Sequence, residues 1–342
     1  MDIIHKILQW IAGFFAVTEI SKIIHSGNYS SLTTFKGIVA LLKPLIPIVT
    51  LLEFIIALLY RKLKLIDYKI SFFSYLTNAI IGRFISIAAV AFCIGLFEKH
   101  AILKSEPTWY WFLYGYIVWE FGHFIFHYFE HKVRLLWCLH STHHVPQNMN
   151  LSVGFAHFFL EDPYANVIRT TTCILLGVSA PMLLAIMFID GMWAGFNHLG
   201  ENMSRTCKLG PLHKFILTPM HHRVHHGRNP LYIDTNFCNL LNIWDRVFRT
   251  YQPIDPKIPV EYGITRKMLP NSFLDAYFGE FVGLAKDITK APGLKNKFLY
   301  IIMPPGWSHT GDHKTASKLR KDYIEAQKLK PYSEKSINIT VN

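Results

Sequence analysis

The chain has 342 residues, of which 51% are hydrophobic and 15% aromatic, and it carries a formal net charge of +12 at pH 7. A chain of this length could form two soluble domains, but several apolar runs approach the roughly 20 residues that cross a bilayer, so we expect one membrane domain. The sequence has no basic and aromatic module typical of nucleic-acid binding, so the positive charge indicates anionic inner-leaflet lipid rather than nucleic acid.

The first third of the chain is predicted to consist of membrane-spanning helices. Glu19 and Lys22 make the first apolar stretch the weakest, and it could instead lie in the membrane interface. Lys43, Pro44 and Pro47 interrupt the second stretch, which could be kinked or re-entrant. The four expected spans are residues 7–25, 38–60, 72–97 and 109–127.

Two histidine motifs follow the fourth apolar stretch: His127-x3-His131 and His140-x2-His143-His144. Residues three and four apart lie on one face of a helix, so each motif is expected to point its imidazoles in one direction. Pro146 is expected to end the second helix, because the residue before a proline resists the helical conformation. His123 lies one turn before the first motif on the same face, and it could either join the site or line the end of a membrane helix.

The next stretch is predicted to be a helical hairpin. Residues 163–179 and 182–198 are each near the lower length limit for a span, and Ser179-Ala180-Pro181 between them is typical of a turn. If His144 and His198 reach the same site, the chain between them must cross the membrane an even number of times. The alternative is one long tilted helix, which would place His198 on the wrong side.

A third histidine motif, His222-x2-His225-His226, repeats the spacing of the second. His221 also lies four residues before His225, but the repeated spacing favours His222. Imidazole is the commonest metal ligand near neutral pH, and nine imidazoles exceed the four ligands of one zinc ion, so the set indicates a pair of metals. The nine candidate ligands are His127, His131, His140, His143, His144, His198, His222, His225 and His226.

The distribution of positive charge predicts the orientation. The short loop at 61–70 is rich in Lys and Arg, whereas Lys99 and Lys104 in the opposite loop are balanced by Glu98 and Glu106. Loops rich in Lys and Arg remain in the cytoplasm. We therefore expect the histidine motifs and the C-terminus to face the cytoplasm.

This pattern resembles the fatty acid hydroxylase/sterol desaturase superfamily, whose members carry HxxxH, HxxHH and HxxHH motifs around two irons. The segments LWCLHSTHH (136–144), NMNLS (148–152) and TPMHHRVHHGRNPLYIDTNFCNLLNIWDRVFRTY (218–251) carry the resemblance. Together with MPPGWSHTG (303–311), they look most like the alkylglycerol monooxygenase-like branch. Two departures are Arg249, where the family usually has Gly, and a longer insert between His198 and the third motif; neither removes a ligand.

The resemblance implies an all-α, polytopic integral membrane helical bundle with a histidine-box metal site that faces the cytoplasm. Residues 1–107 would be N-terminal transmembrane helices, 108–252 the catalytic domain, and 253–342 a cytoplasmic tail. The implied activity is that of a membrane-bound non-haem di-iron oxygenase that uses O2 to hydroxylate or desaturate a lipid, with ether-lipid cleavage suggested by the branch. The alternatives are a sterol or fatty acid hydroxylase or desaturase of the same superfamily, and, in another class, a histidine-rich membrane metal transporter.

The expected cofactors are two iron ions, because zinc has no redox chemistry; zinc could replace iron on overexpression. The resemblance implies tetrahydrobiopterin as reductant in this branch and cytochrome b5 or ferredoxin in others. No cytochrome b5 domain, Rossmann motif or flavin motif is recognisable, so the electron donor is expected to be external. The sequence indicates no oligomeric state.

Metal-bound imidazoles usually donate their second N–H to a carboxylate or carbonyl group. His157 and His213 lie outside the repeated spacing and are expected to be structural. The candidates to accept from the ligands are Glu130, Asn150, Asp162, Asp234 and Asp245, and Asn202 could complete or water-bridge a metal site.

Overall fold

The computed structural model describes residues 3–14, 17–27, 30, 34–42, 44–60, 64–203 and 209–329. Within these ranges the chain is helical, and its only sheet-like pairing consists of two isolated bridges, Ile216 with Leu241 and Gly227 with Tyr262. The all-α class expected from the sequence is therefore confirmed. Lys43, which interrupts the second apolar stretch, and Arg61 and Lys62, which belong to the basic loop at 61–70, lie outside the described residues.

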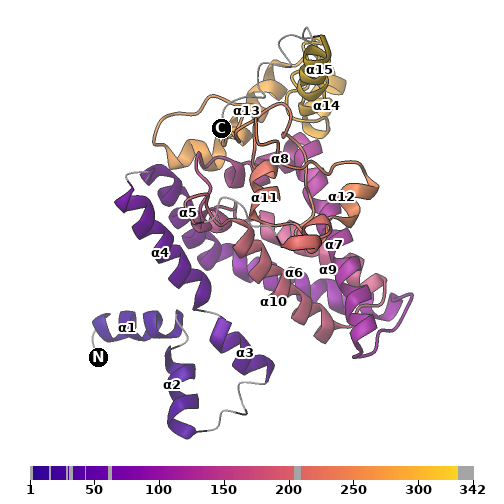
Figure 1. Ribbon diagram of the computed structural model, residues 1–342. Coiled ribbons are helices and arrows are strands. Elements are labelled where there is room, and N and C mark those ends of the chain that lie inside the picture. The colour runs from indigo at the N-terminus through magenta and orange to yellow at the C-terminus, as the bar shows by residue number, and fades with distance from the viewer. Residues whose placement is uncertain are drawn as a thin grey trace.

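Three short helices, α1 (Ile3–Phe14), α2 (Val17–Ser26) and α3 (Phe35–Leu42), lie apart from the main bundle, at the end opposite α13–α15 (Figure 1). The described residues of the expected span at 7–25 belong to two helices, α1 and α2, neither of which is long enough to cross a membrane. Glu19 and Lys22 give the second half polar groups that would lack partners in hydrocarbon. The interruption expected at Pro44 is present, since α3 ends at Leu42 and α4 (Leu45–Leu59) begins after Pro44.

The longest helical segment joins α5 (Leu65–Thr77), a π-helical turn (Asn78–Gly82), α6 (Arg83–Phe97) and a 3-10 turn (Glu98–His100). The π-turn forms where the Asn78 amide donates to the carbonyls of Ser74 and His157. Gly82 is required there, because a Cβ would lie 2.8 Å from the carbonyl oxygen of Phe159. The expected span at 72–97 lies inside this segment.

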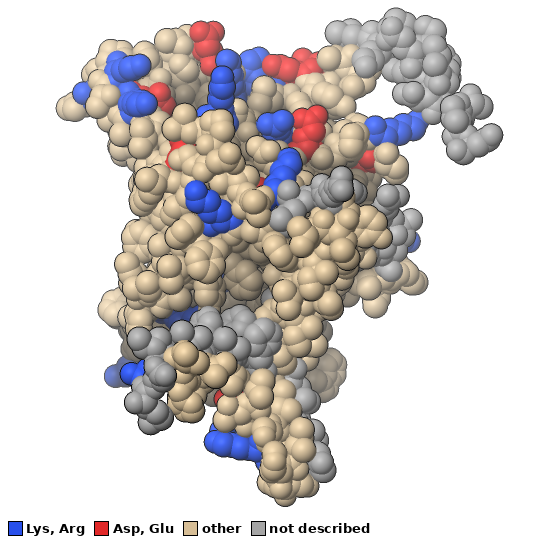
Figure 2. All heavy atoms as spheres, turned by 90° about the vertical axis from the view of Figure 1, so that its left-hand side faces the viewer, with Lys and Arg blue, Asp and Glu red and all other residues tan. Residues whose placement is uncertain are grey.

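By length and apolar composition, two helices among the described residues could cross a membrane, Leu65–His100 and Ala180–Asn197, and Pro47–Leu59 is a shorter apolar helix. On α6, Phe84, Ile87 and Phe92 are each more than 60% exposed, as lipid-facing side chains would be. Acidic and basic side chains gather at the end of the molecule that holds α13–α15, on the face shown in Figure 2.

The stretch 108–252, which was expected to form the catalytic domain, begins with α7 (Trp109–Lys132) and α8 (Arg134–His144). The expected span at 109–127 forms the first part of α7, whose mean hydropathy is lowered by its tyrosines, histidines and Glu120. Helix α8 ends just before Pro146, as the proline predicted.

The expected hairpin is present as α9 (Glu161–Leu175) and α10 (Ala180–Asn197), so the alternative of one long helix is wrong. The turn depends on Gly177, whose φ is 88° and whose missing Cβ would lie 2.4 Å from the Leu103 carbonyl oxygen. His198 caps the C-terminus of α10. The hairpin therefore returns the chain to the end of the bundle where α8 lies (Figure 1).

Shorter helices complete the domain and cover it. They are 3-10 turns at Leu151–Phe155 and Gly210–Lys214, followed by α11 (Pro219–His225), α12 (Ile243–Val247), α13 (Phe273–Lys290), α14 (Gly293–Ile302) and α15 (Ala316–Leu329). Helix α13 packs against α8 and α5, where Glu280 forms ion pairs with Arg134 and Arg266. Residues from the tail region thus close one side of the histidine-bearing helices.

Candidate metal centre

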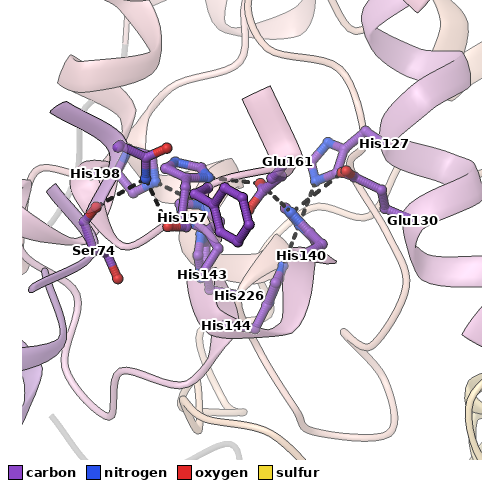
Figure 3. A network of polar contacts seen from close by, with 12 residues as sticks. Ser74, His127, Glu130, His140, His143, His144, His157, Glu161, His198 and His226 are labelled. Carbon is purple, nitrogen blue, oxygen red and sulfur yellow. Dashed lines mark hydrogen bonds and ion pairs between the residues drawn. The ribbon is translucent and has the colours of Figure 1, made fainter. Parts of the chain in front are cut away.

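Four helices bring the nine candidate ligands together at one end of the bundle (Figure 3 labels His127, His140, His143, His144, His198 and His226). Helix α7 supplies two of them, α8 three, the C-terminus of α10 one and α11 with its C-cap three. Eight of the nine side chains are buried and His222 is partly buried. Spacing along each helix makes this possible, because residues at i, i+3 and i+4 share a face.

The nine side chains divide into two groups. We call them the A group, which is His127, His131, His140, His144 and His225, and the B group, which is His143, His198, His222 and His226. Within each group the potential ligand atoms all lie within 4.8 Å of one another. Helices α8 and α11 contribute to both groups, so the two sites share their walls.

Imidazole nitrogens face one another inside both groups. In the A group the Nδ1–H of His127 donates to the Phe237 carbonyl (2.8 Å) and His140 Nδ1 lies 2.8 Å from Glu161. A neutral imidazole has one donor and one acceptor nitrogen, so both Nε2 atoms carry lone pairs, and these lie 3.1 Å apart. Two acceptors at this distance repel each other unless a cation lies between or beside them.

The B group also brings ring nitrogens close together. His198 donates from Nδ1 to the Ala194 carbonyl (2.7 Å), which leaves a lone pair on Nε2. This Nε2 lies 3.1 Å from His143 Nε2 and 2.9 Å from His222 Nε2. In the A group His225 donates from Nδ1 to the Thr235 carbonyl, and its buried Nε2 has no partner among the described residues. The donor set therefore fits two cations held by imidazole nitrogens.

Burial keeps the imidazoles in the form that a metal binds. Removal from water, assisted by the neighbouring imidazoles, lowers the pKa of His143, His144, His225 and His226 well below the usual value. These side chains are neutral at pH 7. Neutral imidazole is the ligating species, so no proton has to be displaced before a metal binds.

Asp234 is the proposed supporting carboxylate that directly contacts a ligand. Its Oδ1 lies 3.1 Å from His131 Nδ1, and its Oδ2 forms an ion pair with Lys132. Burial alone would raise the pKa of Asp234, but the hydrogen bonds and charges of His131 and Lys132 outweigh burial and lower it. Asp234 is therefore a carboxylate that holds His131 with Nε2 directed at the A group.

Asp245 and Asn150, also proposed as supporting residues, lie one step further away. Asp245 accepts from the backbone N–H groups of Phe237 and Cys238, so it positions the carbonyl that holds His127 rather than a ligand itself. Asn150 accepts from Ser152 at the start of a 3-10 turn. Their contacts are with backbone and hydroxyl groups.

Three further candidates differ in how near they lie to the core. Glu130 lies 3.4 Å from His140 Nδ1 and is fully buried, Asp162 lines a cavity beside the core, and Asn202 lines a separate cavity with Glu53.

Glu161 is a supporting residue that sequence reasoning missed. Its Oε1 lies 2.8 Å from His140 Nδ1 and 2.7 Å from His157 Nδ1 (Figure 3). Although burial alone would lower the pKa of His157, the Glu161 carboxylate raises it to about 9. The His157 ring also stacks on that of His143, with ring centroids 4.3 Å apart. The i, i+4 spacing of His157 and Glu161 is the one signal in the sequence that could have found this pair.

Two nearby histidines belong to neither group. His123 lies 3.9 Å from Asp190 and makes an edge contact with the His127 ring. His221 forms a capping box with Thr218 at the start of α11 and approaches the Tyr251 hydroxyl. The choice of His222 over His221 as a candidate ligand therefore agrees with where the two rings point.

The histidine core separates two cavities of about 380 Å³ each. The first, which we call the inner pocket, is bordered by His127, His140, His143, His198 and His222, together with Trp119, Phe126, Arg169 and Asp190. The second, the outer pocket, is bordered by the other four, His131, His144, His225 and His226, together with Trp137, Tyr300 and Trp307. No histidine of the core borders both pockets, so a molecule in one pocket is separated from the other by the core.

Comparison with known proteins supports the resemblance drawn from the motifs. Residues 112–250 match the family model for fatty acid hydroxylase. The chain is 31% identical over 205 residues to alkylglycerol monooxygenase of Xenopus tropicalis and 30% identical over 205 residues to that of Homo sapiens. Both alignments cover 60% of this chain and 44% of the relative, so the chain spans less than half the length of these relatives.

A third relative, ornithine lipid hydroxylase OlsE of Rhizobium tropici, is 26% identical over 184 residues, which cover 54% of each chain. No solved structure matches the chain. These similarities confirm the resemblance to the superfamily and to its alkylglycerol monooxygenase-like branch that the sequence motifs indicated.

The division into two groups predicts that the two ions can be removed separately. Since a metal ion takes about four to six protein ligands, the parent is expected to hold two ions. His143→Ala leaves three imidazoles in the B group and should lose the B ion. The double variant His144→Ala with His225→Ala leaves three in the A group and should lose the A ion, so each variant should retain about one ion per chain. Elemental analysis after purification with iron supplied measures this. His5→Ala, in an exposed part of α1, is the control; unchanged metal content in both core variants would contradict the assignment.

The contacts of Asp234 predict that it supports metal binding directly, whereas Asp245 supports the fold. Asp234→Asn should weaken metal affinity by about 10–100-fold, because such partners orient their ligands. Asp245→Asn should instead lower the thermal midpoint of the metal-loaded protein, because two buried N–H groups lose a charged acceptor. Competition with a chelator and thermal unfolding separate the two effects. Equal metal affinity in the parent and Asp234→Asn would show that the contact is only structural.

Proposed function

We propose that the chain is a membrane-bound lipid hydroxylase that uses O2 and holds two iron ions in its histidine core. The observation that carries this proposal is the set of buried imidazole nitrogens that face one another in the A and B groups. The fatty acid hydroxylase match over 112–250 and the relatives named monooxygenase and hydroxylase support an oxidoreductase acting on a lipid. A histidine-rich metal transporter is less well supported, because the candidate ligands gather at one end of the bundle instead of along a path across it.

Bound iron would supply the activation of O2, which no amino-acid side chain can provide. The overall reaction consumes O2, two electrons and two protons, places one oxygen atom in a C–H bond of the lipid and releases the other as water. The protein's part is to hold nine neutral imidazoles, to exclude bulk water by burial, and to orient His131 and His140 through Asp234 and Glu161.

The inner pocket is the proposed substrate site. Apolar and aromatic groups such as Trp119 and Phe126 line it beside Arg169 and Asp190, so it offers surface for an alkyl chain and hydrogen-bonding groups for a polar head. This combination favours a carbon close to a polar group over the middle of an acyl chain. An alkylglycerol ether lipid meets that description, and a sterol or a fatty acid is the alternative substrate within the superfamily.

Electrons are proposed to reach the core through the outer pocket. Trp137 forms part of its wall, with ring centroids 5.2 Å from His131 and 5.5 Å from His144. Tyr300 and Trp307, from the C-terminal region of the chain, also border the outer pocket. The proposed donor is a reduced pteridine such as tetrahydrobiopterin, and cytochrome b5 or a ferredoxin is the alternative. A donor on this side would not compete with a lipid in the inner pocket.

The proposed membrane arrangement places the histidine core and the C-terminal helices in the cytoplasm and the turn before α10 on the far side. Lys64 and Lys69, at the start of α5, lie at the same end of the bundle as the core and support this orientation by the positive-inside rule.

Incorporation of oxygen from 18O2 tests the activity. The iron-loaded protein should be given an alkylglycerol with tetrahydrobiopterin, and then a sterol or a fatty acid with a ferredoxin or cytochrome b5 system. We expect 18O in the lipid product. If an ether lipid is cleaved to an aldehyde, the aldehyde should be reduced to the alcohol at once, so that its 18O does not exchange with water. His143→Ala is the matched inactive variant. Unlabelled product from every lipid, or full turnover by His143→Ala, would refute the proposed reaction.

Labelling of an introduced cysteine tests the topology. Ala180→Cys places a thiol in the first turn of α10, and Glu325→Cys places one on an exposed position of α15. The four described cysteines are buried, and Cys207 is replaced by Ser in every variant. In intact cells an impermeant thiol reagent should label position 180, and position 325 only after permeabilisation. The reverse result would invert the proposed orientation.

A further inference from the structure

Helix α13 has two faces of opposite character. Its inner face is buried and makes polar contacts with the rest of the protein. The Tyr277 hydroxyl lies 2.9 Å from the Thr77 hydroxyl and 3.0 Å from the Phe159 N–H, and Glu280 forms ion pairs with Arg134 and Arg266. Its outer face carries Leu274, Phe278 and Val282, which are 67%, 42% and 50% exposed. These three residues recur at intervals of four, so they form one stripe along the helix. We call this stripe the α13 outer face.

The apolar stripe becomes basic toward the C-terminus of the helix. The next two positions at the same interval are Lys286 and Lys290, and both are exposed. Lys69 of α5 lies at the other end, with its Nζ 3.4 Å from the carbonyl of Asn271 just before α13. An apolar stripe with lysines at both ends is typical of a helix that lies in the membrane interface, where lysine side chains reach the headgroups.

The contacts of α13 with the segment Leu65–His100 show where α13 lies relative to the expected hydrocarbon layer. The apolar part of Leu65–His100 ends at Phe97, before Glu98 and Lys99. A hydrocarbon core about 30 Å thick is crossed by about 20 helical residues, and counting back from Phe97 reaches the π-turn at Asn78. Helix α13 touches this segment one turn further on, through the Tyr277–Thr77 hydrogen bond and the Phe273–Phe73 ring contact (5.2 Å). It therefore lies at the edge of the expected hydrocarbon layer.

The α13 outer face is continuous with the exposed apolar surface of the proposed span. Phe72 and Phe73 of α5 are 60% and 38% exposed, and Phe73 contacts the first residue of α13. A stripe of three side chains is too small for a stable contact with a second copy, which buries about 800 Å² on each partner. Contact with a bilayer does not require such an area on α13 alone, because the adjoining span would already be in the lipid and the α13 outer face would add to that contact.

We infer that α13 rests on the cytoplasmic leaflet, with Leu274, Phe278 and Val282 at the boundary between headgroups and acyl chains and Lys286 and Lys290 against anionic headgroups. This inference rests on the proposed insertion of Leu65–His100. Because the inner face of α13 supplies Glu280 and Asp287 to the outer pocket, membrane contact would hold that wall of the pocket in place.

Fluorescence quenching in lipid nanodiscs tests the inference on the full-length chain. A fluorophore is attached at Phe278→Cys, at Phe84→Cys in the proposed span and at Glu325→Cys on α15, all with Cys207→Ser. The nanodiscs contain anionic lipid, and the quenchers are a lipid with a nitroxide near its headgroup or in its acyl chain, and aqueous iodide. We expect the nitroxide lipids to remove most of the fluorescence at positions 278 and 84, and iodide to quench only position 325.

The remaining outcomes separate the possible failures. Lipid quenching at 84 with iodide quenching at 278 would overturn this inference and leave the proposed membrane insertion intact. Absence of lipid quenching at 84 would overturn both. Protection of 278 from both quenchers, together with crosslinking between chains, would assign the α13 outer face to a second copy instead.

The role of the lysines is tested by lipid composition. Lipid quenching at position 278 should fall when anionic lipid is omitted, and Lys286→Gln with Lys290→Gln should remove this dependence. Val282→Ala, on the same stripe, retains both lysines and serves as the control. Quenching that is independent of anionic lipid in the parent would refute the assignment of the headgroup contact.

Discussion

The approach of unprotonated imidazole nitrogens inside a buried core is the constraint on which the rest of the structure depends. The Nε2 lone pairs of His127 and His140, which lie 3.1 Å apart, repel one another, and burial removes the water that could separate them. Five of the nine rings are held in place from outside, because a carbonyl or a carboxylate lies at their second nitrogen: His127, His131, His140, His198 and His225. The segment after α11 is shaped for this task. Asp234 and Asn236 adopt φ values of 58° and 57°, which turn the Thr235 and Phe237 carbonyls toward His225 and His127.

Buried carboxylates on the helices hold the loops that carry these carbonyls. Each accepts two or three backbone N–H groups from loop segments near the histidine core, and for all but Asp245 these segments are distant in the sequence. Near a bilayer this arrangement serves two needs, since an irregular loop must find partners for its backbone and a carboxylate must find donors to be buried. The pairs are Glu53 with Leu151 and Gly200, Asp67 with Gln147 and Asn148, Glu120 with Asn239, Leu240 and Leu241, and Asp245 with Phe237 and Cys238.

The sequence predicted what depends on local spacing and on apolar length. The hairpin of α9 and α10 followed from where His144 and His198 must meet. Partners far apart in the chain could not be predicted in this way: Glu120 binds a loop more than a hundred residues later, and nothing in its own surroundings indicates that. Polar residues inside 7–25 were noticed, yet the division into two helices was not expected. Arg249 was noted only as a departure from the family; its φ of 59° explains why glycine is usual there.

The A and B groups differ in how much of the chain must fold before their histidines come together. Four of the five A-group histidines come from α7 and α8, which adjoin in sequence, so most of that site is closed by a short loop. The B group draws on α8, the end of α10 and α11, and it forms only after the hairpin has folded back and α11 has docked. Loop closure costs entropy that rises with loop length, and topology of this kind slows folding. During synthesis, the B group is therefore the part of the core that is completed last, and a chain that stalls after α8 would already carry most of the A group.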